Sequence, residues 1–277
     1  MPTSCNAEPL PAAGAGGPPR AAASGSPLMS GGQESKPAWR ISHHGAVDGV
    51  TGSCHQLSLA DGQSLLIDCG LFQGAETSRE GASAERLAVN FPVGRVRALV
   101  VTHVHIDHVG RLPHLLAAGY RAPIICSEAS AKLLPLVLED AIKVGFTRER
   151  ALAERFLEQI RRQIVALPYK EWQTVVDGEV ELRVKLSPAG HILGSAYVEC
   201  ELRQGSERQR IVFSGDLGAP HTPLLPAPQS PYAADVVVLE STYGDRCHDS
   251  RRDRRQRLQA VCEHAFGNKG ALLIPAF

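Results

Sequence analysis

Residues 102–110 constrain the fold of this chain more than any other segment. They read Thr-His-Val-His-Ile-Asp-His-Val-Gly and directly follow the apolar run 98–101, which predicts a buried strand. The polar side chains therefore fall on the loop at the C-terminal end of that strand. The first two histidines can face one metal ion, whereas the aspartate and the third histidine can reach a second. A helix cap with incidental histidines would not explain four ligand-type residues within six positions, which are His103, His105, Asp107 and His108.

The composition describes a globular chain without overall charge. The 277 residues suffice for one large domain or two small ones, and 29 basic residues balance 29 acidic ones. No global field draws such a chain to nucleic acid or membrane, so a polyanion must be bound by a local patch or by the site itself. The seven cysteines form no Cys-x-x-Cys pair, and no apolar run reaches the length of a membrane span. We expect a cytoplasmic protein with reduced thiols and no membrane contact, and nothing in the sequence specifies an oligomeric state.

The composition changes near residue 38. Residues 1–38 are rich in Ala, Gly, Pro and Ser, which predicts a disordered tail, and they lack the apolar core of a signal peptide. Met29 begins more ordinary sequence and is an alternative start. From Trp39 onward, short strands with turn signals alternate with helical segments, which predicts an α/β (α+β) fold of layered sheets covered by helices.

Turn signals and periodicity place individual elements. Asp61-Gly62 predicts a hairpin within 55–67, and residues 180–186 alternate as a strand with one wet face. Residues 234–239 predict a strand buried on both faces. Helices are predicted over about 127–143, 148–165 and 249–266. The second helix places four apolar residues on one face, namely Leu152, Phe156, Ile160 and Ile164.

Four further ligand-type residues each follow an apolar strand: Asp68, His191, Asp216 and Glu240. Each has glycine or another small residue close by. Taken singly, the aspartates are typical turn residues and the histidine is typical of a core or surface position. Side chains at the ends of neighbouring strands converge on one edge of a sheet, so their sum favours a site built on a rigid scaffold.

Residues 102–110 resemble the His-x-His-x-Asp-His motif of the metallo-β-lactamase fold, and Asp68, His191 and Asp216 match the other motifs of that superfamily in order. The segments 189–196, 214–218 and 240–245 resemble more narrowly the β-CASP branch, which contains RNA nucleases. Residues 50–54 resemble the opening of that branch, and the match extends from about Ile41 to Phe277.

The resemblance implies an αββα sandwich with two metal ions, expected to be Zn²⁺. It implies one ion held by His103, His105 and His191, and a second held by Asp107 and His108 with Asp216 bridging. Asp68 is expected to orient a ligand histidine. Glu240 corresponds to an acidic residue that supports a catalytic histidine further along the chain. The expected catalytic residues are Asp107, Asp216 and Glu240.

The chain departs from the β-CASP pattern after Glu240. That branch carries a long inserted domain and then two histidine motifs, of which one histidine is expected to complete the second metal site and another to act as the general acid. This chain instead stops at a segment, 271–277, that resembles the strand leading into the insertion. His248 and His264 follow too soon to replace those histidines. We therefore expect residues 39–240 to be the N-terminal part of a metallo-β-lactamase domain and 241–277 to begin the insertion. The sandwich is then incomplete at its C-terminus, and the chain alone is expected to be poorly stable and weakly active or inactive.

The predicted function is a metal-dependent hydrolase that cleaves RNA, in which a metal-bound hydroxide attacks phosphorus at the dinuclear site. One alternative is a metallo-hydrolase of a carboxylic ester, thioester or lactam. The other is an inactive scaffold in an RNA-processing complex. Remaining residues are given structural interpretations: His43 and His44 as structural or surface, His114 and Cys69 as packed, and the arginines of 251–257 as a solvated helix face. His221 is close enough to the Asp216 loop to line the cleft.

Overall fold

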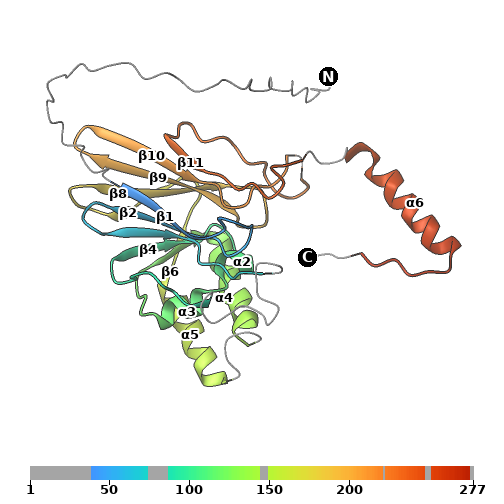
Figure 1. Ribbon diagram of the computed structural model, residues 1–277, viewed down its shortest axis with the longest axis horizontal. Helices are drawn as coiled ribbons and strands as arrows, with labels where there is room; N and C mark the ends of the chain where they lie inside the picture. Colours follow the sequence, from blue (N-terminus) through green and yellow to red (C-terminus); the bar gives the residue numbers. More distant parts are fainter. Residues whose placement is uncertain (1–38, 74–86, 144–148, 221, 247–250, 275–277) are drawn as a thin grey trace, which may run out of the picture. The chain divides into compact units, whose positions relative to one another are not determined.

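Two sheets stack face to face in the computed structural model, which describes residues 39–73, 87–143, 149–220, 222–246 and 251–274. The first sheet has the strand order β1-β2-β3-β4-β5-β6, and the second has the order β11-β10-β9-β8-β7. Figure 1 shows helices α2–α5 on the side of the first sheet that faces away from the second. The predicted tail 1–38 and the alternative start Met29 lie outside the described residues.

The bounds of the elements follow the chain in order. The first sheet contains β1 (Trp39–Gly45), β2 (Cys54–Leu59), β3 (Ser64–Ile67), β4 (Val96–Val100), β5 (Ile124–Ser127) and β6 (Ile164–Leu167). The second contains β7 (Trp172–Val176), β8 (Glu181–Pro188), β9 (Ala196–Gln204), β10 (Glu207–Phe213) and β11 (Val236–Val238). The helices are α2 (Ile106–Val109), α3 (Leu112–Ala117), α4 (Glu128–Ala141), α5 (Arg150–Gln163), the 3₁₀ turn η3 (Arg251–Asp253) and α6 (Arg254–Gly267).

The first sheet is antiparallel on one side and parallel on the other. The hairpin of β2 and β3 turns at Asp61-Gly62, as predicted, and β3 to β6 then run parallel. Parallel strands are covered on both faces, and the four residues of β3 and of β5 are all buried accordingly. Because parallel strands end at the same edge, the loops that follow β3 and β4 lie together there.

One core fills the space between the first sheet and its helices, and another fills the space between the sheets. Leu99, Leu134 and Leu157 belong to the first, whereas Val100, Val198 and Phe213 belong to the second. The C-terminal end predicted for the helix over 148–165 was wrong. The helix stops at Gln163, and Ile164 begins β6, which pairs with β5.

The outer face of the second sheet is charged, because β8 alternates between core residues and polar ones, as predicted. Glu201 on β9 is 4% exposed and forms ion pairs with Arg183, Arg203 and Arg210. Burial opposes ionisation of Glu201, but these guanidinium groups outweigh it and lower its pKa to about 2. The described residues thus form three layers, and none of them supplies a helical layer on this charged face (Figure 1).

The expectation of a strand over 234–239 buried on both faces was wrong. Strand β11 contains only Val236–Val238, and it pairs in parallel with β10 at the edge of the sheet. Val237 is 52% exposed and Leu239 is 63% exposed, because no described residue covers the outer side of this strand. The arginines at the start of α6 are exposed as expected. None of the described helices is long and apolar enough to cross a membrane.

Candidate metal centre

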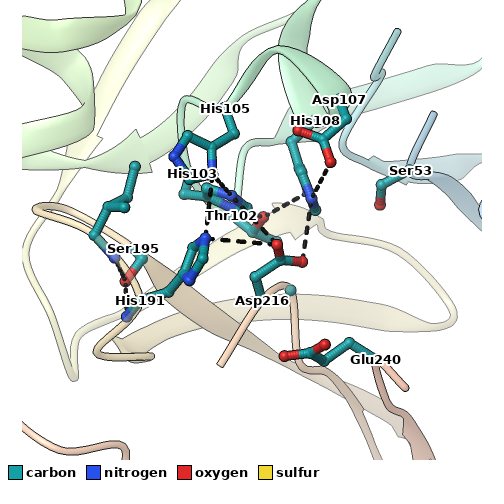
Figure 2. A network of polar contacts seen from close by, with 12 residues as sticks. Ser53, Thr102, His103, His105, Asp107, His108, His191, Ser195, Asp216 and Glu240 are labelled. Carbon is teal, nitrogen blue, oxygen red and sulfur yellow. Dashed lines mark hydrogen bonds and ion pairs between the residues drawn. The ribbon is translucent and has the colours of Figure 1, made fainter. Parts of the chain in front are cut away.

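The predicted site residues meet at one edge of the sandwich. His103, His105, Asp107 and His108 come from the loop after β4 and from α2, while Asp68 follows β3. The second sheet supplies the others, with His191 on the loop between β8 and β9, Asp216 after β10 and Glu240 after β11. Figure 2 shows three imidazole rings turned toward Asp216 from one side and His108 approaching it from the other.

The tightest group consists of three histidines and one carboxylate. Donor atoms of His103, His105, His191 and Asp216 all lie within 4.8 Å of one another. His105 Nδ1 is 3.1 Å from the Nε2 atom of His103 and 3.1 Å from that of His191. Asp216 Oδ2 is 3.5 Å from His191 Nε2 and 3.9 Å from His103 Nε2.

A second set of donors lies on the other side of the Asp216 carboxylate. Its Oδ1 atom is 3.2 Å from His108 Nε2, and the same nitrogen is 3.8 Å from Asp107 Oδ2. The two oxygens of Asp216 therefore face two separate groups of ligand-type atoms. A carboxylate in this position can contact two cations at once.

Asp68 fixes the orientation of the loop that carries the histidines. Its carboxylate accepts hydrogen bonds from the Thr102 backbone N–H at 2.8 Å, from Thr102 Oγ1 at 2.8 Å and from His108 Nδ1 at 2.7 Å. The last bond ties one ring nitrogen and leaves His108 Nε2 facing Asp216. Asp68 has φ of +57°, a left-handed conformation that aspartate tolerates better than most residues and that marks a constrained position.

Small residues let the loops of the two sheets approach closely. Gly215 has φ of +53°, and a Cβ there would lie 2.8 Å from Thr102 Cβ. A Cβ on Gly218 would lie 1.7 Å from the carbonyl oxygen of Gly190, next to His191. Ser195 Oγ accepts the backbone N–H of His191 at 2.9 Å and thereby orders the loop. The glycines noted in the sequence are therefore needed for contact between segments, not only for turns.

Burial and charge set the protonation of these groups. Burial lowers the pKa of His103 well below its usual value and lowers that of His105, which favours the neutral, metal-binding form. Burial also opposes the charge on His108, but the carboxylates of Asp68 and Asp216 outweigh it and raise the pKa of His108 to about 10. Burial likewise opposes ionisation of Asp216, and the proximity of His108 prevails and lowers its pKa. The carboxylates therefore stabilise a positive charge at this place, which either a proton or a metal ion can supply.

The donor set fits a divalent metal ion. A neutral ring nitrogen donates one hydrogen or accepts with one lone pair, so His105 Nδ1 cannot form good hydrogen bonds to two other ring nitrogens at once. Around a tetrahedral ion with bonds of about 2.0–2.1 Å, nitrogen ligands lie roughly 3.3 Å apart, close to the observed 3.1 Å. Imidazole and carboxylate groups in this arrangement are what zinc or a similar ion takes from proteins.

A cavity of about 240 Å³ adjoins this cluster. Asp68, His108, Asp216 and Glu240 line it, together with residues of β1 and β2 and the loop between them. Glu240 accepts the backbone N–H of Leu217 at 2.9 Å and so steadies the Asp216 loop. No Lys or Arg is among the described residues that line the cavity, whereas three carboxylates are.

His43 is exposed, which agrees with the expectation of a structural or surface residue. It also lines the cavity with His55 and Ser53, whereas its neighbour His44 stacks on Phe91. The sequence alone did not indicate this, because only the register of β1 and β2 makes His43 and His55 partners.

The remaining cysteine and histidines singled out in the sequence either do not line the cavity or lie outside the described residues. Cys69 is fully buried and packed, as expected, and His114 is half-buried. His264 on α6 contacts Asn268, which follows the helix. His221 and His248 lie outside the described residues.

Comparison with known proteins adds an independent line of evidence. Residues 50–276 match the family model described as the metallo-beta-lactamase superfamily. Ribonuclease TTHA0252 of Thermus thermophilus is 40% identical over 86% of this chain and 52% of its own length. Transcription termination factor FttA of Cenarchaeum symbiosum is 35% identical over 80% of this chain and 34% of its own length. Integrator complex subunit 11 of Danio rerio is 28% identical over 87% of this chain and 40% of its own length. The chain thus spans about half or less of the length of these relatives.

Proposed function

Because this chain belongs to the metallo-β-lactamase superfamily and to its β-CASP branch, we propose that it carries the metal centre of an RNA-cleaving phosphodiesterase. Residues 39–240 are then the N-terminal part of the metallo-β-lactamase domain, and 241–277 begin the inserted domain. The described cysteines are all free thiols, which supports a cytoplasmic location.

The observation that carries the proposal is the two-sided environment of Asp216. One oxygen faces His103 and His191, and the other faces His108. We propose that His103, His105 and His191 would hold one zinc ion and that Asp107 and His108 would hold a second, with Asp216 shared by both. Bound there, the ions would supply an activated water and would neutralise charge that develops on a phosphodiester.

The residues of the chain have separate tasks in this proposal. Asp216 holds the two ligand groups at a fixed separation, and Asp107 adds a carboxylate on the His108 side. Asp68 holds the Nδ1 hydrogen of His108, so that Nε2 faces the site. Glu240 fixes the Asp216 loop through Leu217. Asp107, Asp216 and Glu240 remain the proposed catalytic residues.

The charge of the cavity supports a metal-dependent function on a polyanion. Three carboxylates and no described Lys or Arg line the cavity, so a phosphodiester is repelled until cations are bound. The relatives include a protein named ribonuclease, which supports RNA as the substrate rather than an ester, thioester or lactam. The complete set of expected metal ligands in this region argues against an inactive scaffold.

The test combines metal binding with substrate choice. Calorimetric titration with Zn²⁺ should give two equivalents for the wild-type chain and at most one for Asp216→Asn, because the bridging charge is lost. Asp61→Asn, the same change in an exposed turn, is the matched control and should bind as the wild type does. The activity assay uses a protein completed by the inserted domain and the histidine motifs of the β-CASP branch. There, zinc-dependent release of fragments from labelled RNA, without turnover of a generic ester, supports the proposal. Ester turnover without RNA cleavage contradicts it.

A further inference from the structure

Two histidines that the metal centre does not use form part of the wall of the same cavity. His43 on β1 and His55 on β2 are register partners, and their Nδ1 atoms lie 2.8 Å apart. His55 stacks on Phe213 at the end of β10, with ring centroids 6.1 Å apart. Both imidazoles line the cavity beside His108 and Asp216.

Polar contacts connect this pair with the buried Asp68. Ser53 Oγ lies 3.5 Å from Asp68 Oδ2 and 3.5 Å from His55 Nε2. Asp68 is 1% exposed and Ser53 is 6% exposed, whereas His43 is exposed. A chain of contacts therefore runs from an interior carboxylate to an imidazole at the cavity wall.

The direction of the hydrogen bonds along this series of contacts is determined at Asp68, its buried end. Ser53 Oγ donates its single hydroxyl hydrogen to Asp68 Oδ2. Ser53 Oγ must then accept from His55 Nε2. Burial lowers the pKa of His55 to about 4, against weaker opposite effects from Asp68, so this ring is neutral near pH 7 and has one hydrogen. His55 Nδ1 is consequently an acceptor, and His43 Nδ1 donates to it.

A neutral His43 that donates from Nδ1 carries a lone pair on Nε2, on the ring edge away from His55. We propose that this nitrogen accepts a hydrogen bond from a ribose 2′-hydroxyl of RNA bound in the cavity, and so selects RNA over DNA. The inference rests on the proposed function, because it requires a nucleic acid at the metal centre.

The chemistry of the nucleic-acid chain favours the 2′-hydroxyl over its other groups. Phosphate oxygens are acceptors and cannot pair with a lone pair on His43. Base N–H groups donate, but they differ among bases, whereas a 2′-hydroxyl occurs in every ribonucleotide and is only a few bonds from phosphorus.

The first measurement concerns the tautomer and needs no nucleic acid. The ¹⁵N chemical shifts of the His43 ring should report an Nδ1–H tautomer in the wild-type chain at neutral pH. In Ser53→Ala, which removes the hydroxyl between His55 and Asp68, this preference should weaken. An Nε2–H tautomer of His43 in the wild type would overturn the inference.

The second measurement compares two Zn²⁺-loaded variants with the wild type for binding of matched ribo- and deoxyribo-oligonucleotides. His43→Phe should lower RNA affinity about fivefold and leave DNA affinity unchanged, as expected for one hydrogen bond. His44→Phe makes the same chemical change at the neighbouring position and should alter neither. Equal losses for RNA and DNA, or none, overturn the inference but leave the proposed function in place. Failure of the wild type to bind either polymer contradicts both.

Discussion

Asp68→Asn tests the role of Asp68 in positioning the metal ligands. Asparagine also tolerates the left-handed φ of +57°, so the backbone adds little to the effect. Its amide oxygen can still accept from the Thr102 N–H. Its NH₂ group, however, would face two donors, Thr102 Oγ1 and His108 Nδ1, which now lie 2.8 Å and 2.7 Å from Oδ2.

The expected magnitude follows from these two lost hydrogen bonds. A hydrogen bond to a charged group contributes about 1.5–3 kcal/mol, so the free energy of unfolding should fall by roughly 3 kcal/mol or more. Because His108 loses the partner that orients its ring, zinc affinity on its side of Asp216 should fall about 10- to 100-fold.

Urea unfolding in the presence of chelator measures the first quantity, and calorimetric titration with Zn²⁺ measures the second. Asp61→Asn provides the control, since Asp61 bonds to Gln63 and Arg95 in an exposed turn. Wild-type stability together with wild-type zinc affinity in Asp68→Asn would contradict this role of Asp68.

Three further predictions concern stability. In urea unfolding, Gly215→Ala should lower the free energy of unfolding by about 1–3 kcal/mol more than Gly119→Ala does. Both glycines have positive φ, but only a Cβ at position 215 would meet a neighbouring side chain, so equal losses would contradict this. His55 binds a proton near pH 6.5 in the unfolded chain but only near pH 4 in the folded protein. The free energy of unfolding should therefore decline by at most about 3 kcal/mol as the pH falls through this window. In pH-dependent unfolding measurements, His55→Gln should flatten this decline. Glu201→Gln should cost about 1–3 kcal/mol near pH 7, and the loss should fade as pH falls from 4.5 toward 2, where the wild-type carboxyl is protonated too. The exposed control Glu154→Gln should change stability by well under 1 kcal/mol.

The sequence sufficed to predict the parts of the fold that depend on local patterns. The hairpin at Asp61-Gly62 and the alternating strand β8 follow from turn chemistry and periodicity, and both are confirmed. The end of α5 did not follow, because Ile164 continues the helical spacing while pairing with β5 decides its conformation. Burial of β11 could not be judged either, since an apolar run does not reveal whether its strand lies at a sheet edge.

The candidate site was predictable where ligand-type residues are dense. His103 to His108 and the strand-end residues Asp68, His191 and Asp216 do converge, as the motif order indicated. The part played by Thr102 as a link between Asp68 and the histidine loop needed the structure, because its contacts join distant segments. The position of His43 and His55 at the cavity could not be predicted for the same reason: only the register of β1 and β2 brings them there.

The most direct test of the central claim is anomalous diffraction at the zinc edge from crystals of the Zn²⁺-loaded chain. We expect two peaks, one on each side of the Asp216 carboxylate. The first should be bounded by His103, His105 and His191, and the second by Asp107 and His108. Absence of both peaks, or zinc bound only elsewhere on the chain, would contradict the dinuclear centre.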